Sequence, residues 1–404
     1  MNITVLKFGW EFPPHNYGGL GVACQGLVHG LVEQGVRILL VLPYRFEGEQ
    51  TDYDVLYPYD NNLLQIKRVK CNLIPYLITR SVFDQKLYAE SNIHLYGADI
   101  FAEVYRYEQA ARDIARNYDF DIIHAHDWLS ILAGIEAKRV KNKPLIVHIH
   151  ATEFDRTGGN NYHPEVYEIE KRGMILADQV ITVSNKTKQN IITHYGIDAN
   201  KIEVIHHGVP IHAERINEIT IEKKSGPIVL FLGRLTLQKG PDYFVAAAKK
   251  VLEHRNDVTF VIAGSGDMEK RLIEQVAALG IADNVLFTGF LKGNEALRML
   301  KMADVFVMPS VSEPFGLVAL EAIKARAPVI VSKNAGVCEV LSHCLTVDFW
   351  DINELANKIL GVLEHKELQN ELNNNAQHNI AALTWDKAAK KCINVYERAL
   401  AIGR

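Results

Sequence analysis

The chain has 404 residues, of which 48% are apolar and 23% charged, with a formal net charge of -4 at pH 7. This composition is typical of a folded globular protein and excludes a disordered or fibrous chain. The small negative charge indicates neither a nucleic-acid partner nor binding to an anionic membrane.

The five cysteines are scattered, without a CxxC pair and without the spacing of metal ligands. A sparse, odd set indicates reduced thiols in a cytoplasmic protein. No apolar run has the length of a membrane span, and the opening MNITVLKFGWEFPP has too short an apolar stretch for a signal peptide. We therefore expect a cytoplasmic protein, and membrane association is not indicated.

Short β-branched runs alternate with amphipathic helical segments, which is the pattern of parallel sheets covered by helices. In the first half the predicted strands are 3–8, 37–42, 121–126, 145–150 and 179–184. Residues 51–97 hold short strand-like pieces and polar turns without a clear helix, so we expect an antiparallel insertion there.

The alternation fails at 206–226, where charge accumulates, and a domain linker is predicted in this segment. It then restarts with predicted strands at 227–233, 258–264, 284–289, 303–309 and 327–332. We expect an α/β protein with two doubly wound, Rossmann-like domains, at 1–207 and 208–383. Residues 384–404 hold a helix with one apolar face, which we expect to pack back on the N-terminal domain.

A glycine-rich turn, NYGGLGVACQGL at 16–27, follows the first predicted strand. Gly18, Gly19 and Gly21 allow the backbone to approach an anion at the start of the next helix. A flexible lid or a dinucleotide turn would have a similar composition, although the GxGxxG spacing is not met.

Two strand ends in the first domain, in HAHDW (124–128) and HIHATEFD (148–155), carry titratable side chains. Ligands of doubly wound sheets bind outside the carboxyl ends of the strands, so these side chains are expected to line a cleft. They are His126, Asp127, His150, Glu153 and Asp155. For a single histidine at such a position, a structural role is the alternative.

A metal site is not predicted. His124 and His126 share one strand face, as do His148 and His150, but no third ligand has a recognisable spacing. The DFD at 119–121 has the form of a diphosphate-binding DxD, but it lies at the start of a strand, the wrong end for a ligand.

The loop in FLGRLTLQKGPDYF (231–244) carries Arg234 and Lys239 between a strand and a helix. A planar guanidinium and a mobile ammonium suit a diphosphate, and an ordinary solvated pair is the alternative. Gly264, in a Gly-Ser-Gly turn after the next strand, is interpreted as part of the nucleotide pocket wall, with a plain turn as the alternative.

The segment PSVSEPFGLVALEAI (309–323) gives the strongest signal, with a predicted helix beginning near Phe315 or Gly316. The free backbone N–H groups of its first turn suit phosphate or sugar oxygens, and they are those of Gly316, Leu317 and Val318. Glu313 and Glu321 can accept hydrogen bonds from a hexose and a ribose. The alternative is that Glu313 caps the helix and Glu321 faces solvent.

The motifs GGLG, HAHDW, GRLTLQKG and EPFGLVALE, in this order and spacing, resemble the retaining GT-B glycosyltransferases of family 4 and the related glycogen and starch synthases. The resemblance covers nearly the whole chain. It implies two Rossmann-like domains facing a central cleft, the N-terminal one on the acceptor side and the C-terminal one binding a nucleotide sugar.

By this resemblance Arg234 and Lys239 would hold the donor diphosphate, Glu321 the ribose and Glu313 the donor hexose. His150 would contact the transferred sugar near its anomeric centre.

The resemblance also implies that Gly19 gives its amide to the phosphate, and that Asp127 and Glu153 lie in the acceptor cleft. Phe315 stands where bacterial glycogen synthases have a cysteine, and Asn16-Tyr17 where they have a lysine. The chain is therefore more similar to family 4 and to archaeal-type synthases.

The implied reaction is metal-independent hexose transfer with retention, by front-face substitution and without a cofactor. UDP- or ADP-glucose is the expected donor, and an α-glucan or small glucoside the expected acceptor; glucose rests on resemblance alone. Alternatives are a mannosyl- or other hexosyltransferase of cell-surface glycan synthesis, a GT-B sugar-nucleotide epimerase, and a silent sugar-binding protein. A dehydrogenase would need an acid after the second strand, where 40–44 offers none. The oligomeric state is not predicted.

Overall fold

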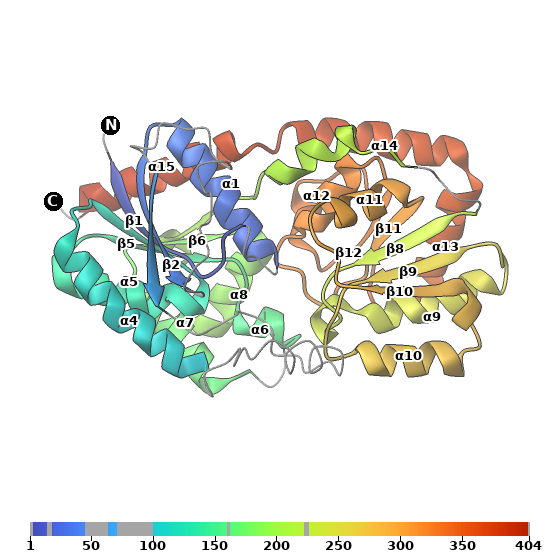
Figure 1. Cartoon of the computed structure of the whole chain (residues 1–404), viewed down its shortest axis with the longest axis horizontal. Coiled ribbons are helices and arrows are strands. Elements are labelled where there is room, and N and C mark those ends of the chain that lie inside the picture. Colours follow the sequence, from blue (N-terminus) through green and yellow to red (C-terminus); the bar gives the residue numbers. More distant parts are fainter. Residues whose placement is uncertain are drawn as a thin grey trace.

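A computed structural model describes residues 3–13, 18–44, 64–70, 100–159, 162–221 and 226–402. Within these ranges the chain forms two parallel β-sheets, each covered by helices, that stand side by side with their loops meeting between them (Figure 1). This is the α/β architecture predicted from the alternation of strands and helices.

The N-terminal sheet has the strand order β3-β2-β1-β4-β5-β6-β7. Its strands are β1 (Thr4–Phe8), β2 (Arg37–Tyr44), β3 (Leu64–Lys70), β4 (Ile122–His126), β5 (Leu145–Ile149), β6 (Gln179–Thr182) and β7 (Ile202–Val204). Its helices are α1 (Gly19–Glu33), α4 (Ile100–Asn117), α5 (Asp127–Lys141), α6 (Glu153–Arg156), α7 (Pro164–Leu176) and α8 (Asn185–Tyr195). The central strands β4 and β5 are buried at every residue, which explains their nearly continuous apolar sequence.

The antiparallel insertion expected at 51–97 is wrong for β3. This strand pairs in parallel with β2, from Ile38 opposite Leu64 to Tyr44 opposite Lys70. Its alternating sequence LQIKRVK is that of an edge strand, and such alternation does not distinguish parallel from antiparallel pairing. The other residues of this segment lie outside the described ranges.

The C-terminal sheet has the order β10-β9-β8-β11-β12-β13. Its strands are β8 (Ile228–Leu232), β9 (Thr259–Ala263), β10 (Val285–Gly289), β11 (Val305–Met308), β12 (Val329–Ser332) and β13 (Leu345–Val347). Its helices are α9 (Pro241–Leu252), α10 (Glu269–Ala278), α11 (Asn294–Met302), α12 (Leu317–Lys324), α13 (Ile352–Glu364) and α14 (Lys366–Ala381). Two 3-10 turns also bear on the site, η2 (Ile211–Glu218) and η3 (Leu237–Lys239).

The chain crosses between the domains a second time before α15 (Trp385–Ile402), which packs against α1 of the N-terminal domain (Figure 1). Trp385 lies against Gly26 and Gly30 of α1, where an added Cβ would come within 2.0 Å of its ring and 2.5 Å of its carbonyl oxygen. Its indole N–H donates to the Val209 carbonyl at 2.8 Å, so the two crossings lie side by side.

Candidate active site between the two sheets

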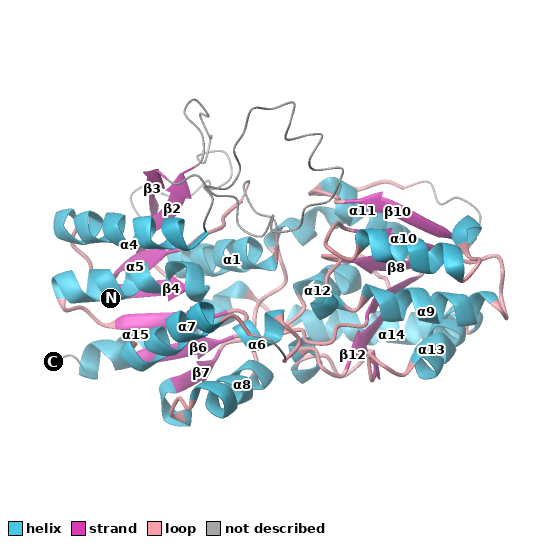
Figure 2. Cartoon of the chain, turned by 90° about the horizontal axis from the view of Figure 1, so that it is seen from below, coloured by secondary structure: helices cyan, strands magenta, loops and turns pink. Residues whose placement is uncertain are grey.

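The carboxyl ends of the two sheets bring their loops together in the middle of the molecule, where Figure 2 shows α6 of one domain close to α12 of the other. A Cβ at Gly19, the first residue of α1, would lie 3.6 Å from Leu317 Cδ1. The glycine-rich turn and the start of α12 therefore face each other, although they are about 300 residues apart in sequence. The residues just before this turn, 14–17, lie outside the described ranges.

The loop after β8 holds Arg234 and Lys239 in a fixed conformation. Gly240 has φ +64°, and a Cβ there would lie 2.3 Å from the Pro309 carbonyl oxygen. Gly264 has φ +147°, and a Cβ there would lie 1.8 Å from the Gly233 carbonyl oxygen. Both positions therefore require glycine, and Gly264 supports the loop by close backbone packing.

Lys239 and Glu313 lie in contact. Lys239 Nζ donates to Glu313 Oε2 at 2.5 Å, and Ser310 Oγ lies 3.4 Å from the same oxygen. Arg234 Nη2 donates to Gln238 Oε1 at 3.2 Å. The two strongest sequence signals thus come together at neighbouring strand ends, and the alternative of a solvated basic pair does not hold for Lys239.

The helix α12 begins at Leu317, one or two residues later than predicted, after Gly316 in the left-handed region at φ +114°. No side chain caps it, so the alternative in which Glu313 is a helix cap is wrong. Phe315 is buried and packs edge-on against His207, with ring centroids 4.9 Å apart. The amides of Leu317 and Val318 lie in the first turn, where helix N–H groups lack intrahelical acceptors.

Glu321 is buried, and its Oε1 lies 3.1 Å from His212 Nε2 in η2. The alternative of a solvent-facing Glu321 is therefore wrong. Burial, the largest single influence, lowers the pKa of His212, but the hydrogen bond to Glu321 and the negative charge of Glu321 together outweigh it, and the pKa is raised. His212 lies in the predicted linker, and its sequence context gave no signal.

Five buried histidines form a column: four lie on β4 and β5 or directly after β5, and one follows β7 and stacks on His150. They are His124, His126, His148, His150 and His207. His126 Nδ1 and His150 Nε2 are 2.8 Å apart, and His124 Nδ1 lies 2.6 Å from the Tyr396 hydroxyl. Burial lowers the pKa of each histidine, that of His207 to about 3. The imidazoles are therefore neutral at physiological pH. The sequence did not single out His207, because it lies three residues after β7, which is too short to be recognised, whereas His126 is the last residue of the clearly predicted strand β4.

The nitrogen atoms of His148, His150 and His207 lie within 4.8 Å of one another. A metal ion has to lie in the plane of each ligating imidazole, along its lone pair. The His148 and His150 rings instead stack with centroids 4.3 Å apart and planes inclined by 19°, and His150 and His207 stack at 5.3 Å and 27°. Nearly parallel planes do not meet at one point close to the rings, so these histidines would have to reorient to bind a metal.

Asp127, the first residue of α5, holds the end of β5. Its Oδ1 accepts the backbone N–H of His150 at 2.6 Å and that of Ala151 at 3.4 Å. Asp127 has φ +53°, an uncommon value for a residue other than glycine. Burial raises the pKa of its carboxyl to about 7. Asp127 thus fixes the backbone of His150.

Glu153 is buried at the start of α6. Its carboxylate accepts from Arg156 Nε at 3.0 Å and from the backbone N–H of His163 at 3.0 Å. These contacts tie α6 to the beginning of α7.

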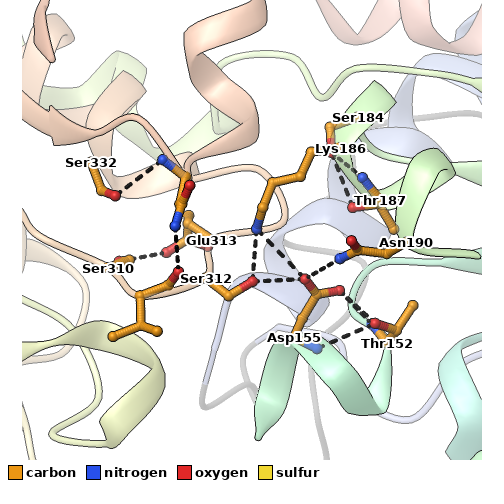
Figure 3. A network of polar contacts seen from close by, with 12 residues as sticks. Thr152, Asp155, Ser184, Lys186, Thr187, Asn190, Ser310, Ser312, Glu313 and Ser332 are labelled. Atoms are coloured by element: carbon orange, nitrogen blue, oxygen red, sulfur yellow. Dashed lines mark hydrogen bonds and ion pairs between the residues drawn. The ribbon is translucent and has the colours of Figure 1, made fainter. Parts of the chain in front are cut away.

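A polar network joins the domains beside Glu313 (Figure 3). Ser312 Oγ donates to Asp155 Oδ1 at 2.8 Å and accepts from Lys186 Nζ at 2.7 Å. Glu339 of the C-terminal domain accepts the backbone N–H groups of Asn185 and Lys186 at 2.8 and 2.9 Å, at the start of α8. The sequence signalled neither Lys186 nor Ser312, because each makes its contact across the cleft with a residue more than 120 positions away.

Two family models match the chain. One, described as Glycosyltransferase Family 4, matches residues 17–213, and one described as glycosyl transferases group 1 matches 213–379. An uncharacterised glycosyltransferase of Methanocaldococcus jannaschii is 32% identical over 98% of this chain and 99% of its own. A glycogen synthase of Mycobacterium tuberculosis is 30% identical over 84% of this chain and 80% of its own.

Solved structures share the fold. The sucrose-phosphate synthase of Thermosynechococcus elongatus matches with a TM-score of 0.77 at 21% identity, covering 99% of this chain and 100% of that chain. HepE of Anabaena, solved with UDP and glucose, matches with a TM-score of 0.71 at 18% identity, covering 98% and 100%. Among the described helices, none is long and apolar enough to cross a membrane. From its family matches and its full-length relative, the chain belongs to the glycosyltransferases with the GT-B fold.

Proposed function

We propose that the protein is a retaining glycosyltransferase that moves a hexose from a nucleotide-diphosphate sugar to a hydroxyl group of an acceptor. The observation that carries the proposal is the contact between Lys239 and Glu313, with Arg234 on the same loop. Two cations and a buried carboxylate at neighbouring strand ends match a ligand with a diphosphate at one end and a hexose at the other.

In this proposal Arg234 and Lys239 stabilise the charge of the leaving diphosphate, together with the amides of Gly19 and of the first turn of α12. Glu313 accepts hydrogen bonds from hexose hydroxyls, and Glu321 from the ribose. His150 contacts the transferred sugar as a neutral imidazole. Gly264 and Phe315 support the donor site, while Gly316, Leu317 and Val318 supply the amides.

The proposed mechanism is front-face substitution without a metal, in which the leaving phosphate oxygen accepts the proton of the attacking hydroxyl. Two carboxylates support it, because they are occupied: Asp127 by the backbone N–H groups of His150 and Ala151, and Glu153, three residues after His150, by Arg156. A covalent route would need a free carboxylate beside the anomeric carbon. Asp127 and Glu153 are proposed to shape the acceptor side of the cleft.

We further propose glucose as the hexose and UDP or ADP as the nucleotide. The support is the likeness to a glycogen synthase and to a structure containing UDP and glucose. A mannosyl- or other hexosyltransferase is the second candidate, since the chain is also similar to a D-inositol 3-phosphate glycosyltransferase of Salinispora tropica, 29% identical over 70% of the chain, whose name specifies no hexose. Glu313 alone does not decide between these hexoses, because glucose and mannose share their 3- and 4-hydroxyls.

The proposal is tested with a panel of UDP-glucose, ADP-glucose and GDP-mannose. Thermal shift measures binding, and release of the nucleotide with and without maltooligosaccharides measures transfer. Transfer from a glucose donor with retained anomeric configuration is the expected result. Transfer from GDP-mannose alone would refute the glucosyl assignment. Conversion of the donor to an epimer without an acceptor would refute transfer itself.

A further inference from the structure

Ser312, the residue directly before Glu313, is held by the opposite domain. It lies in the loop between β11 and α12, whereas its partners Asp155 and Lys186 belong to α6 and to the first turn of α8 (Figure 3). The loop that carries the proposed hexose-binding glutamate is therefore fastened across the cleft at the adjacent residue.

The backbone at Glu313 is extended, since it forms a parallel bridge with Ala335. Successive side chains of an extended segment point in opposite directions. Ser312 accordingly contacts Asp155 and Lys186, while Glu313 contacts Lys239 of its own domain. A displacement of Ser312 therefore changes the orientation of the Glu313 carboxylate.

Two of the three groups in this contact, Asp155 and Ser312, are buried, and Lys186 is half-buried. Asp155 is fully buried, and its Oδ2 accepts from the backbone N–H and the hydroxyl of Thr152 at 2.9 and 2.8 Å. Its Oδ1 accepts from Asn190 Nδ2 at 3.0 Å and from Ser312. Lys186 Nζ, 3.7 Å from Oδ1, compensates the charge. Hydrogen bonds to an ionised carboxylate are about twice as strong as neutral ones, so the Ser312 hydroxyl is firmly oriented.

Within the C-terminal domain, the same loop is held by the loop after β8, which carries Arg234 and Lys239. The backbone N–H groups of Val311 and Ser312 lie 3.0 and 3.4 Å from the carbonyl oxygen of Gln238, the residue before Lys239. The loop that carries Ser312 is therefore bound on one side to the segment holding Lys239, in its own domain, and on the other side to Asp155 and Lys186 of the N-terminal domain.

We infer that Asp155, Lys186 and Ser312 form an interdomain tie that sets the orientation of Glu313, so that Lys186 and Ser312 are positioning residues for the donor hexose. The inference rests on the proposed function. Arg234 and Lys239 lie within the C-terminal domain, so losing the tie should affect the sugar moiety of the donor and spare its diphosphate. Affinity for a nucleotide sugar should fall, and affinity for the free nucleoside diphosphate should not.

The test compares Ser312→Ala and Lys186→Met with Ser312→Thr, which keeps the hydroxyl. Lys188→Met is the matched control, because Lys188 lies on the same helix but donates to the Ile202 carbonyl at 2.7 Å, within the N-terminal domain. Calorimetric titrations use UDP-glucose with UDP, and ADP-glucose with ADP. We expect Ser312→Ala and Lys186→Met to bind the nucleotide sugar about 5- to 20-fold more weakly, or about 1–2 kcal/mol. Binding of the diphosphate should change less than about twofold, and Ser312→Thr should restore sugar binding.

Amide hydrogen exchange of the ligand-free protein gives a second readout, and Ser312→Ala should accelerate exchange in residues 311–316. Nucleotide-sugar binding equal to wild type, with unchanged exchange, would overturn the tie and leave the proposed function intact. Equal weakening of both ligands would show a general structural effect and overturn it as well. A wild-type protein that binds none of these four ligands, and neither GDP-mannose nor GDP, would overturn both.

Discussion

Lys239 Nζ lies 2.5 Å from Glu313 Oε2, so the proposed diphosphate ligand and the proposed hexose ligand form an ion pair with each other. A donor diphosphate at Lys239 competes with Glu313 for the same ammonium group. As the lysine turns toward phosphate, the carboxylate becomes available to sugar hydroxyls. The pair therefore links recognition of the two halves of the donor.

Glu313→Gln tests this link. Glutamine keeps the volume but removes the charge, so it accepts hydrogen bonds from the hexose more weakly and releases Lys239 for phosphate. We expect kcat/KM to fall about 10- to 100-fold, at about 1.4 kcal/mol per factor of ten, while UDP or ADP binds as well as before or more tightly. Calorimetry and initial rates measure the two effects. A loss of nucleotide affinity parallel to the loss of activity would speak against the link.

Arg234→Ala and Lys239→Ala should each lower the rate of transfer about 10- to 150-fold and leave the fold intact. Both side chains are proposed to serve the developing diphosphate charge, and a charge-assisted hydrogen bond contributes about 1.5–3 kcal/mol. Arg271→Ala and Lys250→Ala are controls, because both residues are exposed on neighbouring helices. Circular dichroism checks the fold, and nucleotide release measures turnover. Near-wild-type turnover in either variant would remove that residue from the site.

Transfer should survive EDTA. The stacked rings of His148, His150 and His207 do not share a point that a metal could occupy without reorienting them, and the proposed mechanism assigns charge stabilisation to side chains and amides. Initial rates with and without the chelator measure this, with a manganese-dependent glycosyltransferase as positive control. Loss of activity that manganese or magnesium restores would contradict the metal-free mechanism.

The protein should lose stability as the pH falls below about 6.5. Burial holds the pKa of the five column histidines well below 6.5, so in this range the unfolded chain takes up protons that the folded chain does not. Each histidine then costs about 1.4 kcal/mol per pH unit. Asp127, with its pKa raised to about 7, opposes this trend and offsets part of it.

Thermal unfolding between pH 5 and 8 measures how steeply stability falls as the pH is lowered, and His207→Asn should make this dependence shallower. His207 is the appropriate position because, among the described residues, neither of its ring nitrogens has a hydrogen-bond partner. A melting temperature independent of pH over this range would contradict the expectation.

Gly26→Ala should destabilise the protein by about 1–3 kcal/mol. Its Cβ would lie 2.0 Å from the Trp385 ring, which the hydrogen bond to Val209 holds in place. Gly361→Ala is the control, because a Cβ at this helical position meets no atom of the described chain within 4 Å, and it should be neutral or stabilising. Urea unfolding compares the two variants. Equal stability would show that α15 is not tightly docked on α1.

The sequence predicted site residues well where polar side chains come directly after a buried strand. Polar residues after buried runs placed Arg234, Lys239 and Glu313 at one edge of a sheet, because parallel strands end on the same side. It was uninformative for β7 and β13, whose three residues are too short to show a periodicity. It also missed Lys186, Ser312 and His212, since no local pattern tells which side chains meet across two domains.

The return of α15 to the N-terminal domain has a consequence for synthesis on the ribosome. The face of α1 that contacts Trp385 stays uncovered until residues 385–402 have left the exit tunnel, by which time the whole C-terminal domain has been translated. The domain started first is therefore finished last. Expression of residues 1–207 alone would leave the apolar face of α1 exposed and prone to aggregation. Adding the 385–402 helix as a separate peptide should cover this face again.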